Sequence, residues 1–473
     1  MNSPLQTDLY QLTMAAAYWQ AGKAEQKSIF QLFFRRLPFK GGYAIAAGLG
    51  PSLEWLEDFR FSTEELDYLA TLRGSLGMPL FKEAFLEYLR ELRLDLSIDA
   101  IPEGTAVFPH EPLLRVRGAI VQAQLVETAL LNIINFQTLI ATKAARVCGA
   151  AQGDSVMEFG YRRAQGPDGG LSASRAAWIG GCAATSNVLA GMKFGIPVKG
   201  THAHSWVMSF DEEAEAFDRY AEAMPDNSIL LVDTYDTLKG VAKAIATGRK
   251  LREAGHELGG IRLDSGDLAW LSQQARAMLD EAGFPDAKIV ASNDLDEHLI
   301  ESLKYQQAKI DVWGVGTNLV TAADQPALGG VYKLAALRDD EGVWHEKIKL
   351  SEQRAKSSIP GCQQVRRFVK DGLMVGDAIH TEGADLGERV TIIDPVDGLR
   401  RKELDGKGED LLKPVMKNGT RIWNESLDEA RKRCEISLSQ LHPGIRRLEN
   451  PHVYPAGLEQ GLWERREEML RRQ

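Results

Sequence analysis

The sequence predicts an α/β protein: an incomplete α/β barrel of parallel strands beside a mixed α+β domain. Between Ser155 and Thr317 one pattern repeats, in which a short apolar run is followed by a loop with polar residues or Gly and then by a helical stretch. This repeat is typical of βαβ units, whose crossover helices join parallel strands. The segments before and after it lack the regular alternation. The length of 473 residues suits two or three domains at roughly 150 residues each.

The first segment, residues 1–147, is predicted to form the mixed N-terminal domain. Its run IFQLFFRRLPF predicts a strand that ends at Pro38, because proline cannot donate to a strand ladder. The apolar stretch from Ala119 to Ala141 is interrupted by Gln, Glu and Asn residues, so it predicts a buried helix and not a membrane span.

Residues 148–335 are predicted to form the barrel-like catalytic domain. Its helices show regular periodicity, as in Asp267 to Glu281, which is expected to end before Gly283. The strands are expected at six apolar runs: Val156–Phe159, Ile196–Val198, Ile229–Val232, Gly260–Leu263, Ile289–Ala291 and Ile310–Val312.

Residues 336–473 return to short strand-like runs between turn signals, namely HEKIKLSE, QQVRRFV, RVTIIDPVDG and LLKPVMKNGT. We expect this segment to complete the N-terminal domain and to form a small cap. The tail from Ala456 predicts a charged surface helix with Leu458, Leu462 and Met469 facing inward.

Composition narrows the class of protein. The net charge is -10, with 56 Lys and Arg against 66 Asp and Glu, which argues against broad binding to nucleic acid or anionic membranes. The four cysteines are far apart and form no C-x-x-C pair, so they predict reduced thiols of a cytoplasmic protein. The N-terminus has no apolar run behind a basic start, so a secretory signal is not expected.

Nearly every unusual polar cluster follows one of the predicted strands. In parallel α/β folds the ligand site lies at the carboxyl ends of the strands, so we expect these loops to face one pocket. The clusters are GYRRAQGPDGG from Gly160, KGTHAHSW from Lys199, DTYDT from Asp233, DSGD from Asp264, SNDLD from Ser292 and GVGTN from Gly314.

Two of these clusters suit anion recognition. Arg162 and its neighbour Arg163 offer planar guanidinium groups for a carboxylate or phosphate, although solvated surface arginines explain them equally well. Gly314, Gly316 and Thr317 could cradle a phosphate with backbone N–H groups, or simply form a tight packing turn.

The DSGD cluster carries two carboxylates. Asp264 and Asp267 bracket Ser265 and Gly266, an arrangement able to bind ribose hydroxyls or Mg²⁺ water. For Asp267 we favour a helix N-cap.

His202 and His204 admit three interpretations. An H-x-H pair on a barrel strand can bind a metal, and a single His can act as a base or accept a phosphoryl group. The third is an ordinary loop histidine. His256 precedes its predicted strand and His298 lies in a predicted helix, so neither falls at a strand end, which disfavours a zinc hydrolase. Tyr10 and Phe159 could stack on an aromatic ligand, or belong to the core.

Taken together, the motifs resemble the nicotinate phosphoribosyltransferase family, which are type II phosphoribosyltransferases. The resemblance spans Thr7 to Gly361, with long strings in the same order. The matching strings are TDLYQLTM from Thr7, EFGYRRAQGPDGG from Glu158, SNVLAG from Ser186, GTHAHSW from Gly200, IRLDSGD from Ile261, VWGVGTNLVT from Val312 and KLSE from Lys349.

The resemblance implies a reaction. Nicotinate and phosphoribosyl pyrophosphate give nicotinate mononucleotide and pyrophosphate in NAD salvage, with coupled ATP hydrolysis through a phosphohistidine at His204. Mg²⁺ would be carried on pyrophosphate and ATP oxygens, with no metal cage of protein ligands, and the protein would be a cytoplasmic homodimer with shared active sites.

The resemblance also implies the site residues. Arg262 and Asp264 join His204 as catalytic residues. Nicotinate would lie between Phe159 and Tyr10, the latter from a partner subunit, with Arg162, Thr201, Ser205 and Arg262 around it; Asp264, Gly314, Gly316 and Thr317 would hold phosphoribosyl pyrophosphate.

The chemistry of these residue types agrees with such a transfer. Displacement at the anomeric carbon passes through a cation-like centre, so the protein needs mainly to neutralise the departing pyrophosphate and to hold the pyridine nitrogen in line.

Four alternatives remain at this stage. A nicotinamide transferase would carry an Asp near Ala183, which we place in a helix, and a quinolinate transferase would need further cations and lacks the GTHAHS loop. A metallohydrolase and a non-catalytic binding homologue are the other two.

Overall fold

The computed structural model describes residues 3–353 and 357–472. By its internal packing the chain divides into two compact units, Met1–Leu139 with Ala327–Gln473, and Ile140–Pro326. Among the described residues, no helix has the length and apolar character needed to cross a membrane.

The first unit contains two large sheets. One has seven strands in the order β13-β12-β1-β5-β3-β19-β20, all paired antiparallel, and the other has six in the order β17-β16-β21-β15-β14-β18. In the second sheet only β15 and β21 run parallel. A short pair, β2-β4, stands apart. The strands are β1 Lys27–Phe34, β2 Ala44–Ile45, β3 Ser97–Ala100, β4 Ala106–Val107, β5 Leu114–Ala119, β12 Gly330–Arg338, β13 Trp344–Glu346, β14 Gln363–Lys370, β15 Leu373–Thr381, β16 Arg389–Ile393, β17 Arg401–Asp405, β18 Lys407–Asp410, β19 Lys413–Lys417, β20 Thr420–Arg421 and β21 Ala456–Glu459.

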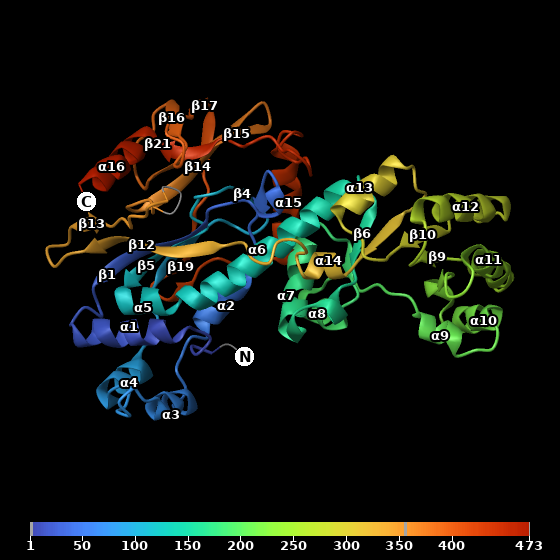
Figure 1. The fold of residues 1–473 in the computed structure, drawn as a ribbon, viewed down its shortest axis with the longest axis horizontal. Helices are drawn as coiled ribbons and strands as arrows, with labels where there is room; N and C mark the ends of the chain where they lie inside the picture. The colour runs from blue at the N-terminus through green and yellow to red at the C-terminus, as the bar shows by residue number, and fades with distance from the viewer. Residues whose placement is uncertain (1–2, 354–356, 473) are drawn as a thin grey trace. The chain divides into compact units, whose positions relative to one another are not determined.

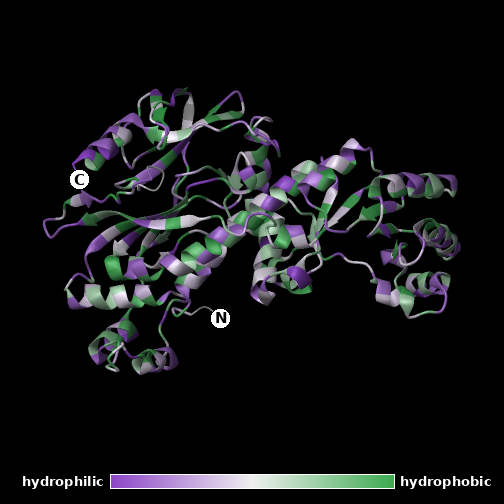
Figure 2. Ribbon diagram, viewed as in Figure 1, coloured by the Kyte–Doolittle hydropathy of each residue, from purple (hydrophilic) through white to green (hydrophobic). Residues whose placement is uncertain are grey.

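Helices cover these sheets, and most of the helices share one large apolar core with them (Figure 1). Figure 2 shows hydrophobic and hydrophilic residues interleaved along the helices, as expected for amphipathic helices with one face buried. The helices are α1 Leu9–Gln20, α2 Leu49–Glu57, α3 Thr63–Thr71, α4 Glu83–Glu91, α5 Ile120–Leu125, α15 Leu427–Gln440 and α16 Gln460–Arg471, while α6 Glu127–Ala150 continues into the second unit.

The second unit is built on a parallel sheet with the order β7-β6-β11-β10-β9-β8. Its inner strands are almost wholly buried, as expected when helices cover a parallel sheet, and α11 and α12 pack on β9 and β10 (Figure 1). The strands are β6 Ser155–Glu158, β7 Ala184–Thr185, β8 Ile229–Leu231, β9 Gly260–Leu263, β10 Lys288–Ala291 and β11 Val312–Val315. The helices are α7 Gly166–Ile179, α8 Val188–Phe194, α9 His204–Met208, α10 Glu213–Ala223, α11 Thr237–Glu253, α12 Leu268–Glu281, α13 Glu297–Tyr305 and α14 Thr317–Val320.

The predicted fold class is confirmed, and five of the six predicted runs overlap a parallel strand. The run Ile196–Val198 forms no full strand: Val198 makes only an isolated parallel bridge to Thr185, which belongs to β7, a strand that was not predicted. The last strand is displaced toward the carboxyl end, where Gly314 obscures the strand signal.

Three boundaries in the first unit also differ from prediction. The strand β1 ends at Phe34 and not at Pro38, because its partner β12 begins at Gly330, opposite Phe34. The expected helix Ala119–Ala141 is split into α5 and α6. In the tail, Leu458 lies in β21, ahead of the helix, and is fully buried together with Leu462.

Candidate active site

A cavity of about 190 Å³ opens at the carboxyl ends of four neighbouring parallel strands. Each strand contributes the residues at or just beyond its end, as the sequence pattern predicts for a parallel sheet. The lining residues are Phe159, Arg162 and Arg163 after β6, Gly314, Gly316 and Thr317 at β11, Ser292, Asn293 and Asp294 after β10, and Arg262 and Asp264 at β9.

Arg262 links three segments of this site. Its Nε donates to Ser292 Oγ at 2.9 Å, its Nη1 to Thr201 Oγ1 at 3.3 Å and its Nη2 to Asp264 Oδ1 at 3.2 Å. The guanidinium carbon lies 6.0 Å from the centre of the Phe159 ring, at the outer limit of a cation–π contact. Because the side chain is only 18% exposed and all three nitrogens are engaged, Arg262 is held in one orientation.

Phe159 owes its position to two glycines, one on β11 and one just after it. A Cβ atom at Gly314 would lie 2.8 Å from Phe159 Cδ2, and one at Gly316 would lie 3.2 Å from its carbonyl oxygen. Gly314 therefore serves close packing, one of its two predicted interpretations, and also lines the cavity. The ring is packed against backbone where a side chain would otherwise be.

A buried carboxylate holds the loop that follows Phe159. Glu158 is 1% exposed, and its Oε1 accepts from the backbone N–H of Gly160 at 2.5 Å. Its Oε2 accepts from Ser174 Oγ at 2.8 Å and from Thr185 Oγ1 at 2.5 Å. These bonds compensate the cost of burying the charge and position the turn that carries Arg162.

The two histidines of the H-x-H pair have different environments. His202 is buried; its Nε2 accepts from the backbone N–H of Leu231 at 3.2 Å, which requires Nδ1 to carry the proton. Burial lowers the pKa of His202, which keeps the ring neutral. His202 is therefore a structural histidine.

His204, by contrast, begins α9 with its side chain 40% exposed. Its Nδ1 lies 3.1 Å from Thr234 Oγ1 and its Nε2 lies 3.7 Å from Asp264 Oδ2. No group of three or more His, Cys, Asp or Glu side chains suited to a metal occurs in the described part of the chain, so the metallohydrolase alternative lacks a ligand set there.

The two carboxylates of the DSGD cluster, Asp264 and Asp267, have different hydrogen-bond partners. The backbone N–H of Asp264 and the hydroxyl of Ser265 donate to Asp233 Oδ2, at 2.8 Å and 2.6 Å, while the Asp264 side chain accepts from Arg262 and Ser292. Asp267 accepts from the N–H of Trp270 at 3.0 Å and caps α12, which confirms the N-cap interpretation.

Several of these residues were part of a predicted cluster without a role of their own. Ser292 directly follows β10, and Asp233 and Thr234 lie shortly after β8, but their partners are about thirty residues away in the sequence. Asn293 and Asp294 have positive φ angles of 97° and 45°, which Asn and Asp tolerate better than other side chains.

The remaining predicted residues are placed as follows. Arg162 and Ser205 are exposed, Arg162 at the cavity and Ser205 in α9 beside His204. Tyr10 lies on α1 of the first unit and is 49% exposed. Ala183 does not lie in a helix: it precedes β7, and its N–H donates to Val156 O at 2.7 Å.

Comparison with known proteins points to one family. Models of the nicotinate phosphoribosyltransferase N-terminal domain, family and C-terminal domain match residues 5–135, 155–355 and 363–466. The chain is 46% identical over 468 residues to the nicotinate phosphoribosyltransferase of Bacillus subtilis (strain 168), covering 97% of this chain and 93% of that protein. It is 35% identical over 520 residues to the nicotinate phosphoribosyltransferase of Homo sapiens, covering 97% and 95%.

Solved structures agree with this result. The crystal structure of human nicotinic acid phosphoribosyltransferase superposes with a TM-score of 0.85 at 32% identity, covering 98% of this chain and 99% of that chain. A nicotinate-nucleotide pyrophosphorylase from Pyrococcus furiosus shares the fold, with a TM-score of 0.70 at 22% identity and coverage of 92% and 95%. Because the family models match most of the chain and the similarity to these relatives runs along nearly its whole length, the chain belongs to the nicotinate phosphoribosyltransferase family.

Proposed function

We propose that this protein transfers the phosphoribosyl group of phosphoribosyl pyrophosphate to nicotinate, the first step of NAD salvage in the cytoplasm. The bond from the anomeric carbon to pyrophosphate breaks, its electron pair leaves with pyrophosphate, and the pyridine nitrogen forms the new bond. Membership in the family supports this reaction, and so does a cavity at the strand ends that holds both a fixed cation and an aromatic face.

The observation that carries the proposal is the fixed orientation of Arg262. A guanidinium held by Ser292, Thr201 and Asp264 beside the Phe159 ring suits an aromatic carboxylate, which needs a ring to stack on and a cation at its edge. Arg162 lines the same cavity and would add a second cation. Thr201 and Ser205 would complete the nicotinate site.

Phosphoribosyl pyrophosphate would bind along the other side of the cavity. Asp264 has carboxylate oxygens suited to ribose hydroxyls, and Gly314, Gly316 and Thr317 line the same cavity, where backbone N–H groups would bind a phosphate.

ATP hydrolysis would be coupled to the transfer through His204. An unprotonated imidazole nitrogen attacks the γ-phosphorus of ATP, ADP leaves with the electron pair of the broken P–O bond, and water later releases phosphate from the histidine. The 40% exposure of His204 leaves the ring accessible, and its proximity to Asp264 would let the added negative charge act on the pyrophosphate part of the site.

Mg²⁺ would enter on the oxygens of pyrophosphate and ATP. The carboxylates of Asp264 and Asp294 line the cavity and can contact hydrated Mg²⁺, which typically uses one or two protein carboxylates together with substrate phosphates. Bound there, Mg²⁺ would neutralise part of the charge on the leaving group.

The proposal includes a homodimer with shared active sites. Tyr10, half-exposed on α1, would then stack on nicotinate bound to the partner subunit.

The test is mononucleotide formation from phosphoribosyl pyrophosphate and Mg²⁺, with nicotinate or nicotinamide as the acceptor and with or without ATP. We expect product from nicotinate, at a rate that ATP raises. Product from nicotinamide alone would contradict the acid specificity, which rests on Ala183 in place of an acidic residue. No product from either acceptor would point to quinolinate or to a binding role.

A further inference from the structure

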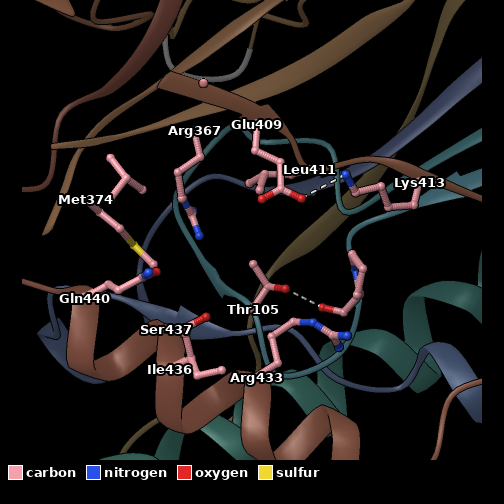
Figure 3. Close-up of a pocket in the computed structure, with 13 residues that line it drawn as sticks. Thr105, Arg367, Met374, Glu409, Leu411, Lys413, Arg433, Ile436, Ser437 and Gln440 are labelled. Carbon is pink, nitrogen blue, oxygen red and sulfur yellow. Dashed lines mark hydrogen bonds and ion pairs between the residues drawn. The ribbon is translucent and has the colours of Figure 1, made fainter. Parts of the chain in front are cut away.

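A second cavity, of about 510 Å³, lies entirely within the first unit. Its walls come from the loop before β4, from β14, β15, β18 and β19, and from α15 (Figure 3). None of these elements belongs to the unit that holds the candidate active site. The volume falls in the range of about 300–1,000 Å³ that small-molecule sites occupy.

Much of the wall is apolar. Met374 and Leu411 are 6% and 8% exposed, and Pro102, Val369 and Ile436 add further hydrocarbon surface. An apolar wall with a few polar groups directed inward is the usual composition of a ligand site.

Arg367 supplies the first of these polar groups. It is 5% exposed, its Nε donates to Asp377 Oδ1 at 3.0 Å, and its Nη2 donates to Asp377 Oδ2 at 2.6 Å and to Ala106 O at 2.7 Å. Nη1 has no hydrogen-bond partner among residues 3–353 and 357–472, and Figure 3 shows the guanidinium directed into the cavity. A guanidinium nitrogen that faces the cavity and has no partner within the protein favours a ligand that brings an acceptor oxygen.

Ser437 supplies the second polar group that faces the cavity. It is 5% exposed on α15, and in the described structure its hydroxyl has no hydrogen-bond partner. Figure 3 shows this hydroxyl facing the cavity from the lower wall, while the guanidinium of Arg367 points down toward it from the upper wall. The two donors could therefore be satisfied by one ligand group.

Each cation at the cavity is paired with one carboxylate, so the preference for an anion rests on the unpaired Nη1 donor of Arg367. Three cations line the cavity, Arg367, Lys413 and Arg433, but only one carboxylate, Glu409, which pairs with Lys413 at 3.0 Å. Arg367 and Arg433 are paired with Asp377 and Glu425, neither of which lines the cavity.

We propose that this cavity binds a small organic anion: a flat apolar body packed against Met374 and Leu411, with an oxyanion that accepts from Arg367 Nη1 and the Ser437 hydroxyl. The site is separate from the proposed transferase site and does not depend on that activity.

The probe for the test is 2-naphthoate, a fused aromatic ring that carries one carboxylate. The full chain is labelled with [methyl-¹³C]methionine, and the Met374 signal is assigned with a Met374→Leu variant. An aromatic ring beside this methyl group shifts its resonance. We expect a saturable shift of the Met374 signal, and at least tenfold weaker binding of 2-naphthylmethanol, which lacks the charge.

Two serines on α15 form a matched pair. Ser437→Ala removes the inward hydroxyl and should weaken 2-naphthoate about tenfold, as expected for loss of one hydrogen bond to a charged group. Ser439→Ala should leave affinity unchanged, because Ser439 is exposed and donates to Ile436 O at 2.7 Å.

A third variant separates the two sites. Arg262→Ala should not change the Met374 titration. Three results would overturn the proposal: no saturable shift of Met374 into the millimolar range, equal effects of Ser437→Ala and Ser439→Ala, or loss of the shift in Arg262→Ala. Equal affinity for 2-naphthylmethanol would refute the preference for an anion.

Discussion

Replacing Arg262 by lysine tests whether the geometry of the guanidinium, beyond its charge, supports catalysis. Arg262 donates to Ser292, Thr201 and Asp264 through three different nitrogens. A lysine ammonium is a single point that cannot reach all three, so at least two of these hydrogen bonds are lost while the charge remains. At about 1.5 kcal/mol for each hydrogen bond that involves a charged group, the loss is about 3 kcal/mol, or roughly 100-fold in kcat/KM for nicotinate.

The matched control is Arg276→Lys. Arg276 has the same side-chain exposure of 18%, and it donates to Ala287 O at 2.7 Å and Phe284 O at 2.6 Å and pairs with Asp280 at 2.9 Å. It does not line the cavity.

Both variants should lose some thermal stability, but only Arg262→Lys should lose activity in steady-state assays of mononucleotide formation. A kcat/KM of Arg262→Lys within twofold of the original protein, or an equal loss in Arg276→Lys, would contradict this role of the guanidinium.

Three further predictions concern His204, Gly314 and His110. His204→Ala should keep slow mononucleotide formation but lose stimulation by ATP, measured as the ratio of rates with and without ATP; retained stimulation would move the phosphoryl acceptor elsewhere. Gly314→Ala places a Cβ 2.8 Å from the Phe159 ring, so the ring must move. KM for nicotinate should then rise roughly tenfold while the melting temperature changes little. An unchanged KM would show that the Phe159 ring does not take part in nicotinate binding. Burial lowers the pKa of His110 to about 4, whereas the pKa in the unfolded chain is about 6.5. The neutral ring therefore contributes fully to the free energy of unfolding above about pH 6.5, and this contribution is lost as the pH falls toward 4. Between pH 7 and pH 5 the loss is roughly 2 kcal/mol. Because His110 has a φ of 72°, which Asn tolerates, His110→Asn should reduce the difference in urea midpoint between pH 7 and pH 5, and an unchanged difference would assign the pH dependence to other groups.

Features that depend on residues close together in the chain could be predicted from the sequence. The apolar runs and helical periodicities predicted the parallel sheet, and Asp267 was predicted as a helix cap three residues from the N–H that it accepts. Arg162, Asp264 and Gly316 were predicted at one cavity because the carboxyl ends of parallel strands share an edge, whereas Arg262 was assigned to it by the family resemblance.

Which of these side chains contact one another, and which are buried, depends on the tertiary structure. His202 and His204 are two residues apart, yet one is buried against Leu231 and the other is accessible beside Asp264. Ser292 became part of the site through Arg262, which lies thirty residues earlier in the sequence.

The cavity at Arg367 and Ser437 could not be predicted, because its walls come from segments that are distant in sequence. Turns, caps and periodicities reflect contacts within a few residues, whereas burial and hydrogen-bond partners depend on how distant segments pack.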